Sequence, residues 1–80
     1  MNTFTERIAA YFRQQPEVWI PAVDLERVGG RQAWRTRLSE ARRHYGMTIE
    51  NRIRWVPPRV GRAGDQVPGF RLSEYRYVPR

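Results

Sequence analysis

The stretch RQAWRTRLSEARRHYG, residues 31–46, combines an apolar stripe with a high density of arginine. Its large apolar side chains recur at spacings of four, three and four residues, which places them on one side of an α-helix: Trp34, Leu38, Ala41 and Tyr45. The other positions include five arginines and one glutamate, and Gly46 is suited to the left-handed residue that closes a helix. The stretch therefore predicts a helix over about residues 31–45 that is buried on one side and cationic on the other.

Two further helices are predicted before this one. Apolar residues at helical spacing predict a helix over about residues 3–15, which Pro16 ends. Residues 18–20 are apolar and too few for a helix, so we expect one short strand or an extended connector there. A short helix over about residues 21–28 then ends at a pair of glycines.

The hydrophobic period changes from 3.6 to two after the third helix. Residues 49–56 alternate in the pattern of a half-buried strand, and residues 70–78 form a second, aromatic-rich strand. The alternation slips between Leu72 and Tyr75, where we expect a bulge or a bend. Residues 57–69 are rich in proline and glycine and predict a loop. Three helices, a short strand and a C-terminal β-hairpin predict an α+β fold, with residues 1–80 as one domain.

Arginine supplies all the basic charge of the chain. The formal net charge is +7, the sequence pI is about 11.2, and the 15 basic residues include no lysine. Residues 1–30 contain three arginines and four acidic residues, whereas residues 31–80 contain twelve arginines and four acidic residues. Arginine suits phosphates and base edges, although the codon usage of a GC-rich genome would also explain the missing lysine. The C-terminal part is therefore a candidate surface for nucleic acid.

Cysteine and long apolar runs are both missing from the sequence. Without cysteine there is no disulfide framework and no thiolate metal site. No apolar run approaches the roughly 18 residues of a membrane span, and the N-terminus lacks the apolar stretch of a signal peptide. We therefore expect a cytoplasmic protein that makes no contact with a membrane.

Two segments resemble those of a known family. RLSEARRHYGMTIENR, residues 37–52, and SEYRYV, residues 73–78, resemble small winged helix-turn-helix domains of bacteriophages and prophages. Those domains have an R-I-S-E-L-R-like run, a glycine turn, an I-x-N-R-like strand and a closing S-E-Y-R strand. The resemblance implies a helix-turn-helix over about residues 21–45 and a wing hairpin over about residues 47–78. It also implies double-stranded DNA as the partner, with the third helix in the major groove and the wing on the backbone or minor groove.

A helical wheel over the third helix separates two sets of candidate DNA contacts. The side opposite the apolar stripe bears side chains that can hydrogen-bond to base edges: Gln32, Thr36, Ser39 and Arg43. Phosphate contacts are expected from arginines that flank the stripe or lie on the wing: Arg31, Arg35, Arg42, Arg52, Arg54, Arg59 and Arg62. We expect base contacts to give specificity and phosphate contacts to give affinity.

Catalysis has little support in the sequence. His44 is the single histidine, and no motif for nucleotide binding or zinc hydrolysis is present, so we expect no enzyme, cofactor, metal site or small-molecule substrate. The first hypothesis is a DNA-binding regulator or a replication or recombination factor. The alternative is a winged-helix module that docks an acidic protein, for which exposed Leu, Phe or Met on the third helix would be evidence. RNA is disfavoured by its narrow major groove, and a homodimer stays open.

Overall fold

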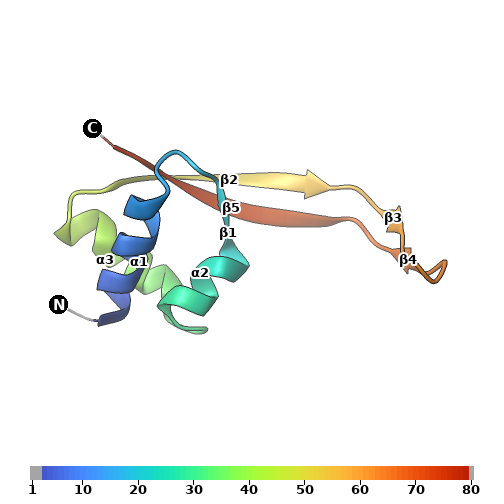
Figure 1. The fold of residues 1–80 in the computed structure, drawn as a ribbon, viewed down its shortest axis with the longest axis horizontal. Coiled ribbons are helices and arrows are strands. Elements are labelled where there is room, and N and C mark those ends of the chain that lie inside the picture. Colours follow the sequence, from blue (N-terminus) through green and yellow to red (C-terminus); the bar gives the residue numbers. More distant parts are fainter. Residues whose placement is uncertain (1–2, 80) are drawn as a thin grey trace.

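The computed structural model describes residues 3–79 and has three helices and two antiparallel sheets (Figure 1). The helices are α1 (Thr3–Gln14), α2 (Ala22–Gly29) and α3 (Trp34–His44). The strands are β1 (Ile20–Pro21), β2 (Thr48–Val56), β3 (Arg59–Val60), β4 (Gln66–Val67) and β5 (Phe70–Val78). The predicted α+β fold is confirmed, and the order of elements is a winged-helix-like topology. No helix of residues 3–79 is long and apolar enough to span a membrane.

The sheet is a long hairpin with one short strand added to its edge. Its strand order is β1-β5-β2, and all neighbours are antiparallel. Thr48 pairs with Val78 at one end and Val56 pairs with Phe70 at the other. Strand β1 has only two residues, and its second residue, Pro21, has no N–H to continue a ladder. The short strand predicted over residues 18–20 is therefore present at residues 20–21, as an edge strand next to β5, and α2 begins one residue later than predicted.

The hairpin differs from the predicted one in two respects. Its pairing runs through Leu72 and Tyr75 in an unbroken register, so the expected bulge is wrong. Residues 57–69 are not only a loop, because β3 and β4 pair within them, Arg59 with Val67 and Val60 with Gln66. This pairing continues the register of β2 and β5 beyond a break. Prolines on both strands interrupt the ladder at that point, since a proline donates no backbone hydrogen bond.

Helix α3 begins three residues later than predicted. Residues 31–33 form a turn, and the amide of Trp34 donates to the carbonyl of Gly30 at 3.1 Å. Gly30 has φ of 94°, a conformation in which a side chain would be strained, so the glycine pair bends the chain sharply between α2 and α3. The C-terminal end agrees with the prediction, because Gly46 has φ of 62° just after the helix.

The core lies between the three helices and one face of the sheet. Each helix contributes its apolar side, and the strands and the turn after α3 complete the cluster: Ile8, Ala9, Phe12, Ile20, Leu25, Trp34, Leu38, Ala41, Met47 and Ile49. The predicted stripe of α3 is confirmed, with Tyr45 partly buried against the cluster. The rings of Trp34 and Tyr75 meet edge to face, with centroids 5.6 Å apart, and thereby join α3 to β5.

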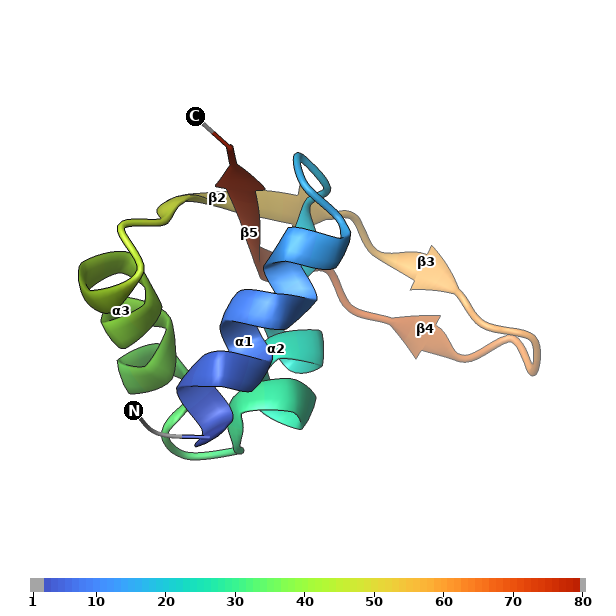
Figure 2. The same ribbon diagram turned by 60° about the vertical axis from the view of Figure 1, so that its left-hand side comes forward.

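The hairpin extends well beyond this core. Figures 1 and 2 show the helices gathered at one end of the molecule, while β2 and β5 continue past them to the tip that β3 and β4 form. We call residues 53–73 the arm. Strand β2 is therefore half-buried only at its start, contrary to the prediction, because Ile53 and Trp55 are 64% and 59% exposed.

Candidate nucleic-acid interface

The outer side of α3 presents polar and cationic side chains to solvent. Thr36, Ser39 and Arg43 are all exposed, and the buried stripe of the helix lies on its other side. Within residues 3–79 no ion pair or side-chain hydrogen bond occupies any of these three groups. Gln32 is also exposed, but it lies in the turn before α3, so its position does not follow from the helical wheel. The structure therefore brings three of the four candidate base-reading residues onto one helix face.

A buried hydroxyl fixes α3 against α1. Thr5 is fully buried, and its Oγ1 donates to Oε1 of Glu40 at 2.9 Å. Nη1 of Arg37 donates to the same oxygen at 2.5 Å. These hydrogen bonds from Arg37 and Thr5 hold the pKa of Glu40 below its ordinary value. The contact positions α3 and engages Arg37 inside the fold, and the spacing of apolar residues alone does not predict it.

The candidate phosphate-binding arginines beside the stripe differ in how free they are. Arg31 is exposed in the turn before α3, and Arg35 is exposed with its guanidinium 4.7 Å from the centre of the Trp34 ring. Arg42 is only half-exposed, because its Nε and Nη2 donate to the carbonyl of Ile49 at 3.2 and 2.6 Å. Arg42 therefore ties the end of α3 to the start of β2, which limits its capacity for a phosphate.

A buried carboxylate engages two of the candidate wing arginines. Glu74 on β5 is 5% exposed, and its Oε1 accepts from Nε of Arg52 at 2.9 Å and from Nε of Arg54 at 3.2 Å. Burial alone would raise the pKa of Glu74, but the two hydrogen bonds outweigh it and hold this pKa below its ordinary value. Arg52 and Arg54 are therefore partly neutralised on the sheet.

The same side of the sheet carries a tryptophan between two guanidinium groups. The groups of Arg52 and Arg76 lie 4.1 and 4.7 Å from the centre of the Trp19 ring. Arg76 also pairs with Glu50 across the strands, with its Nε 3.0 Å from Oε1. These contacts link β2, β5 and the segment before β1, so this surface has a structural role.

The tip of the arm carries the last two candidate phosphate contacts. Arg59 on β3 and Arg62 in the following turn are both exposed, and neither makes an ion pair in the described part of the chain. The amide of Gly61 donates to the carbonyl of Asp65 at 2.7 Å, and the amide of Gly64 donates to that of Gly61 at 3.1 Å. The turn is therefore closed by its own backbone and projects Arg62 outward.

The structure does not bring the tip next to α3. In both views α3 and the tip lie at opposite ends of the molecule, whose longest extent is 47 Å (Figure 2). About 14 base pairs of B-form DNA span that length, since each pair rises about 3.4 Å. The candidate base-reading residues and the tip arginines could thus meet one duplex only at well-separated positions.

The base of the arm holds an exposed basic side chain that is not among the predicted phosphate contacts. Arg71 is exposed and lies directly opposite Trp55 in the register of the hairpin. The pairing of two long strands could have revealed it, because residues opposite each other share a face. An arginine next to an exposed tryptophan is thus added to the candidate surface.

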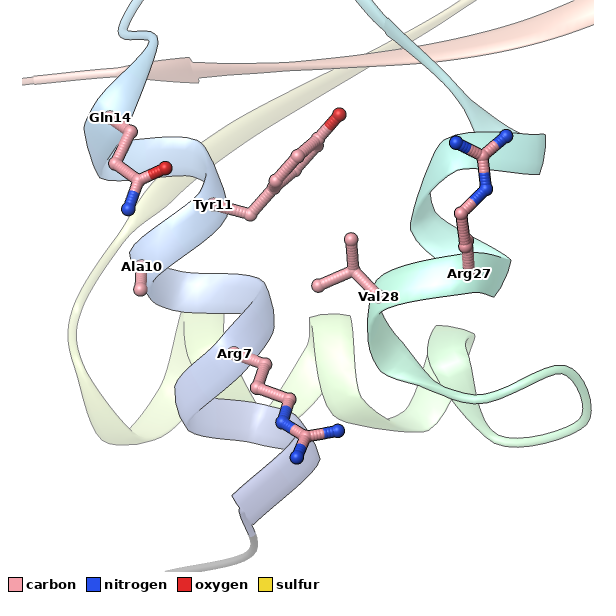
Figure 3. Close-up of a pocket in the computed structure, with 6 residues that line it drawn as sticks. All are labelled: Arg7, Ala10, Tyr11, Gln14, Arg27 and Val28. Carbon is pink, nitrogen blue, oxygen red and sulfur yellow. The ribbon is translucent and has the colours of Figure 1, made fainter.

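An open groove separates α1 from α2. It is lined by Arg7, Ala10, Tyr11, Gln14, Arg27 and Val28. Figure 3 shows Tyr11 and Val28 reaching into the space between the two helices, with α3 behind them. Arg27 is engaged by Asp24 at 3.7 Å, and Arg7 lies 5.4 Å from the centre of the Phe4 ring. The groove has no concentration of free charge and opens away from α3.

Comparison with family models, curated proteins and solved structures finds no match to this chain.

Proposed function

We propose that the protein binds double-stranded DNA, with α3 in the major groove and the arm on the backbone or minor groove. The observation that carries this proposal is the outer face of α3, where Thr36, Ser39 and Arg43 are exposed and without protein partners among residues 3–79. A major groove about 12 Å wide admits a helix, and hydroxyl and guanidinium groups can hydrogen-bond to base edges there.

The charge of the chain supports a polyanionic partner. The net charge is +7, and Arg31, Arg43, Arg59 and Arg62 make no ion pair in the described part of the chain. Free arginines attract a duplex by releasing the counterions that its phosphates hold. A transcriptional regulator and a replication or recombination factor, in a phage or prophage, both require this kind of binding.

The test is fluorescence anisotropy of a labelled random-sequence duplex, titrated with the full chain at several salt concentrations. We expect the logarithm of the binding constant to fall linearly with the logarithm of salt concentration, with a slope of about −4 to −6 for four to six phosphate contacts. Selection from a random library should then return a preferred site. A folded protein that does not bind at low salt would overturn the proposal.

One observation favours a second candidate, a module that docks an acidic protein. The arm exposes apolar side chains, with Ile53 at 64%, Val60 at 70% and Phe70 at 48%. Exposed apolar groups of this kind are more typical of a protein contact than of a phosphate contact. They lie on the arm and not on α3, however, so they do not compete for the face that carries the first proposal. Loss of duplex binding would make this candidate the better one.

A further inference from the structure

The ring of Trp55 packs closely against Gly69, where there is no side chain to keep it away. A Cβ added at Gly69 would lie 2.5 Å from Cζ2 and 2.8 Å from Cη2 of the Trp55 ring, closer than any side chain allows. The six-membered ring of the indole therefore packs on the backbone of Gly69, the residue before β5. Trp55 is still 59% exposed. An aromatic ring that covers a glycine on the opposite strand stabilises a hairpin. That structural role does not require the other face of the ring to be exposed to solvent. Trp55 is thus an exposed aromatic surface that packs on Gly69.

Basic residues lie near Trp55 along the hairpin. Arg71 pairs directly opposite Trp55, and Arg59 lies four residues further along the chain, in β3 beyond the break in the ladder. The arm as a whole contains four arginines and one acidic residue, Asp65. Within residues 3–79 neither Arg59 nor Arg71 makes an ion pair. The ligand of this surface should therefore be negatively charged and should offer a flat group that can stack.

A second copy of the chain does not fit this description. Two arms placed together would bring like charges into contact, which opposes association. A DNA duplex fits only in part, because its bases stack on each other and do not expose their faces. An unpaired nucleotide fits fully, since it joins a phosphate to a base whose π face is free.

We propose that Trp55 stacks on an unpaired base, so that the protein binds duplex DNA next to a single-stranded segment. Arg59 and Arg71 bind the phosphates on either side of that base. The inference rests on the proposed duplex binding by α3 and adds a second site at the far end of the molecule. It makes a junction between double and single strands the preferred ligand.

The experiment compares three labelled probes: a blunt duplex, the same duplex with a 3′ extension of about six thymidines, and the same duplex with a 5′ extension. We expect one extension to tighten binding by about 5-fold to 150-fold, the range that corresponds to roughly 1–3 kcal/mol for one stacked base. Binding to the blunt duplex measures α3 separately, so the two proposals can fail independently.

Matched variants test whether the ring of Trp55 causes the gain in affinity. Trp55→Leu still covers Gly69 with an apolar side chain but has no π face, so it should lose the gain from the extension. Trp55→Phe should keep most of it. Ile53→Ala removes an equally exposed apolar group from the same face and should keep all of it. Circular dichroism melts of each variant verify that the hairpin remains folded.

Each outcome decides the proposal. Equal affinity for blunt and extended probes, or an equal gain in wild type and Trp55→Leu, would overturn the stacking site and leave the duplex proposal standing. A gain that Ile53→Ala also loses would overturn it in favour of a general apolar contact, as expected for a protein partner. Binding only to extended probes, lost in Trp55→Leu, would support the stacking site and overturn duplex binding by α3.

Discussion

The two ends of strand β2 have the same alternating sequence pattern and opposite surroundings. Ile49 and Ile53 are four residues apart on one face of the strand, and they are 7% and 64% exposed. The helices cover the face at Ile49, whereas in the described chain nothing covers it at Ile53. Alternation thus determines which side chains share a face, but other elements determine whether that face is buried. The core end is built for stability, and the arm end is available for contact.

The most direct way to break this comparison is to truncate both isoleucines. Ile49→Ala removes buried methylene groups from the core and should lower the free energy of unfolding by about 2–4 kcal/mol. Ile53→Ala should change it by less than about 0.5 kcal/mol, because its side chain is in water in the folded state. Urea unfolding followed by circular dichroism measures both. Equal losses would mean that a second copy covers the arm, and sedimentation at several concentrations would then show a dimer.

The sequence predicted elements whose signals are local, and it missed features that depend on distant contacts. The strand over residues 70–78 and the closing role of Gly46 follow from period and glycine chemistry, and both are confirmed. The contact of Thr5 with Glu40 joins residues 35 positions apart, so no local pattern could reveal it. The predicted bulge is wrong because a slip in side-chain alternation does not require a slip in the backbone, and the register of β2 and β5 is regular.

The candidate site was predictable to the same extent. The exposed face of α3 followed from the apolar stripe, since the two sides of a helix are complementary. The wheel extended too far at Gln32, because Gly30 and the turn delay the start of the helix. The helical wheel could not show that Arg42 donates to Ile49, since that acceptor is a backbone carbonyl.

Two glycines sharpen the contrast between the ends. A Cβ at Gly29 would collide with Ile8, which is fully buried and cannot move away, and would lie 3.3 Å from Cβ of Trp34. Gly29→Ala should therefore cost about 1–3 kcal/mol of stability. A Cβ at Gly69 would collide with Trp55 and would lie 2.9 Å from Cδ of Pro58. Both neighbours are exposed, so displacing them uncovers little buried surface, and Gly69→Ala should cost less than about 1 kcal/mol. Thermal melts of the two variants test this order, and a reversed order would show that the arm is as tightly packed as the core.

Arginines at the two ends should differ in what they contribute to DNA binding. Arg43→Ala should cost about 1–3 kcal/mol at the selected site and relax base preference at one position. Arg59→Ala and Arg62→Ala should weaken all sequences alike, and each should make the salt slope shallower by about one. Anisotropy titrations against specific and random duplexes separate these effects. Altered sequence choice in the tip variants, with none for Arg43→Ala, would mean that the tip reads bases and α3 does not.

The smallest expected effect is the acid sensitivity of the sheet compared with that of the helices. Arg52 and Arg54 hold the pKa of Glu74 below its ordinary value, so the unfolded chain binds a proton at a higher pH than the folded one. The resulting stabilisation is complete above the ordinary carboxyl pKa of about 4.3 and is lost as the pH falls through the folded value. Glu74→Gln should therefore make the loss of stability below about pH 4.5 shallower.

Glu40 provides the matched test at the helical end, because hydrogen bonds from Arg37 and Thr5 lower its pKa in the same direction. Glu40→Gln and Glu74→Gln should each remove part of the acid sensitivity. The double variant should remove the sum of the two parts, since the carboxylates share no partner in the described structure. Unfolding free energies measured by urea titration between about pH 3 and pH 7 give both slopes. If the pH dependence of the unfolding free energy in the double variant is no shallower than in either single variant, the sheet and the helices titrate as one coupled unit. The separation between a stable end and a contacting end would then hold only for the arm.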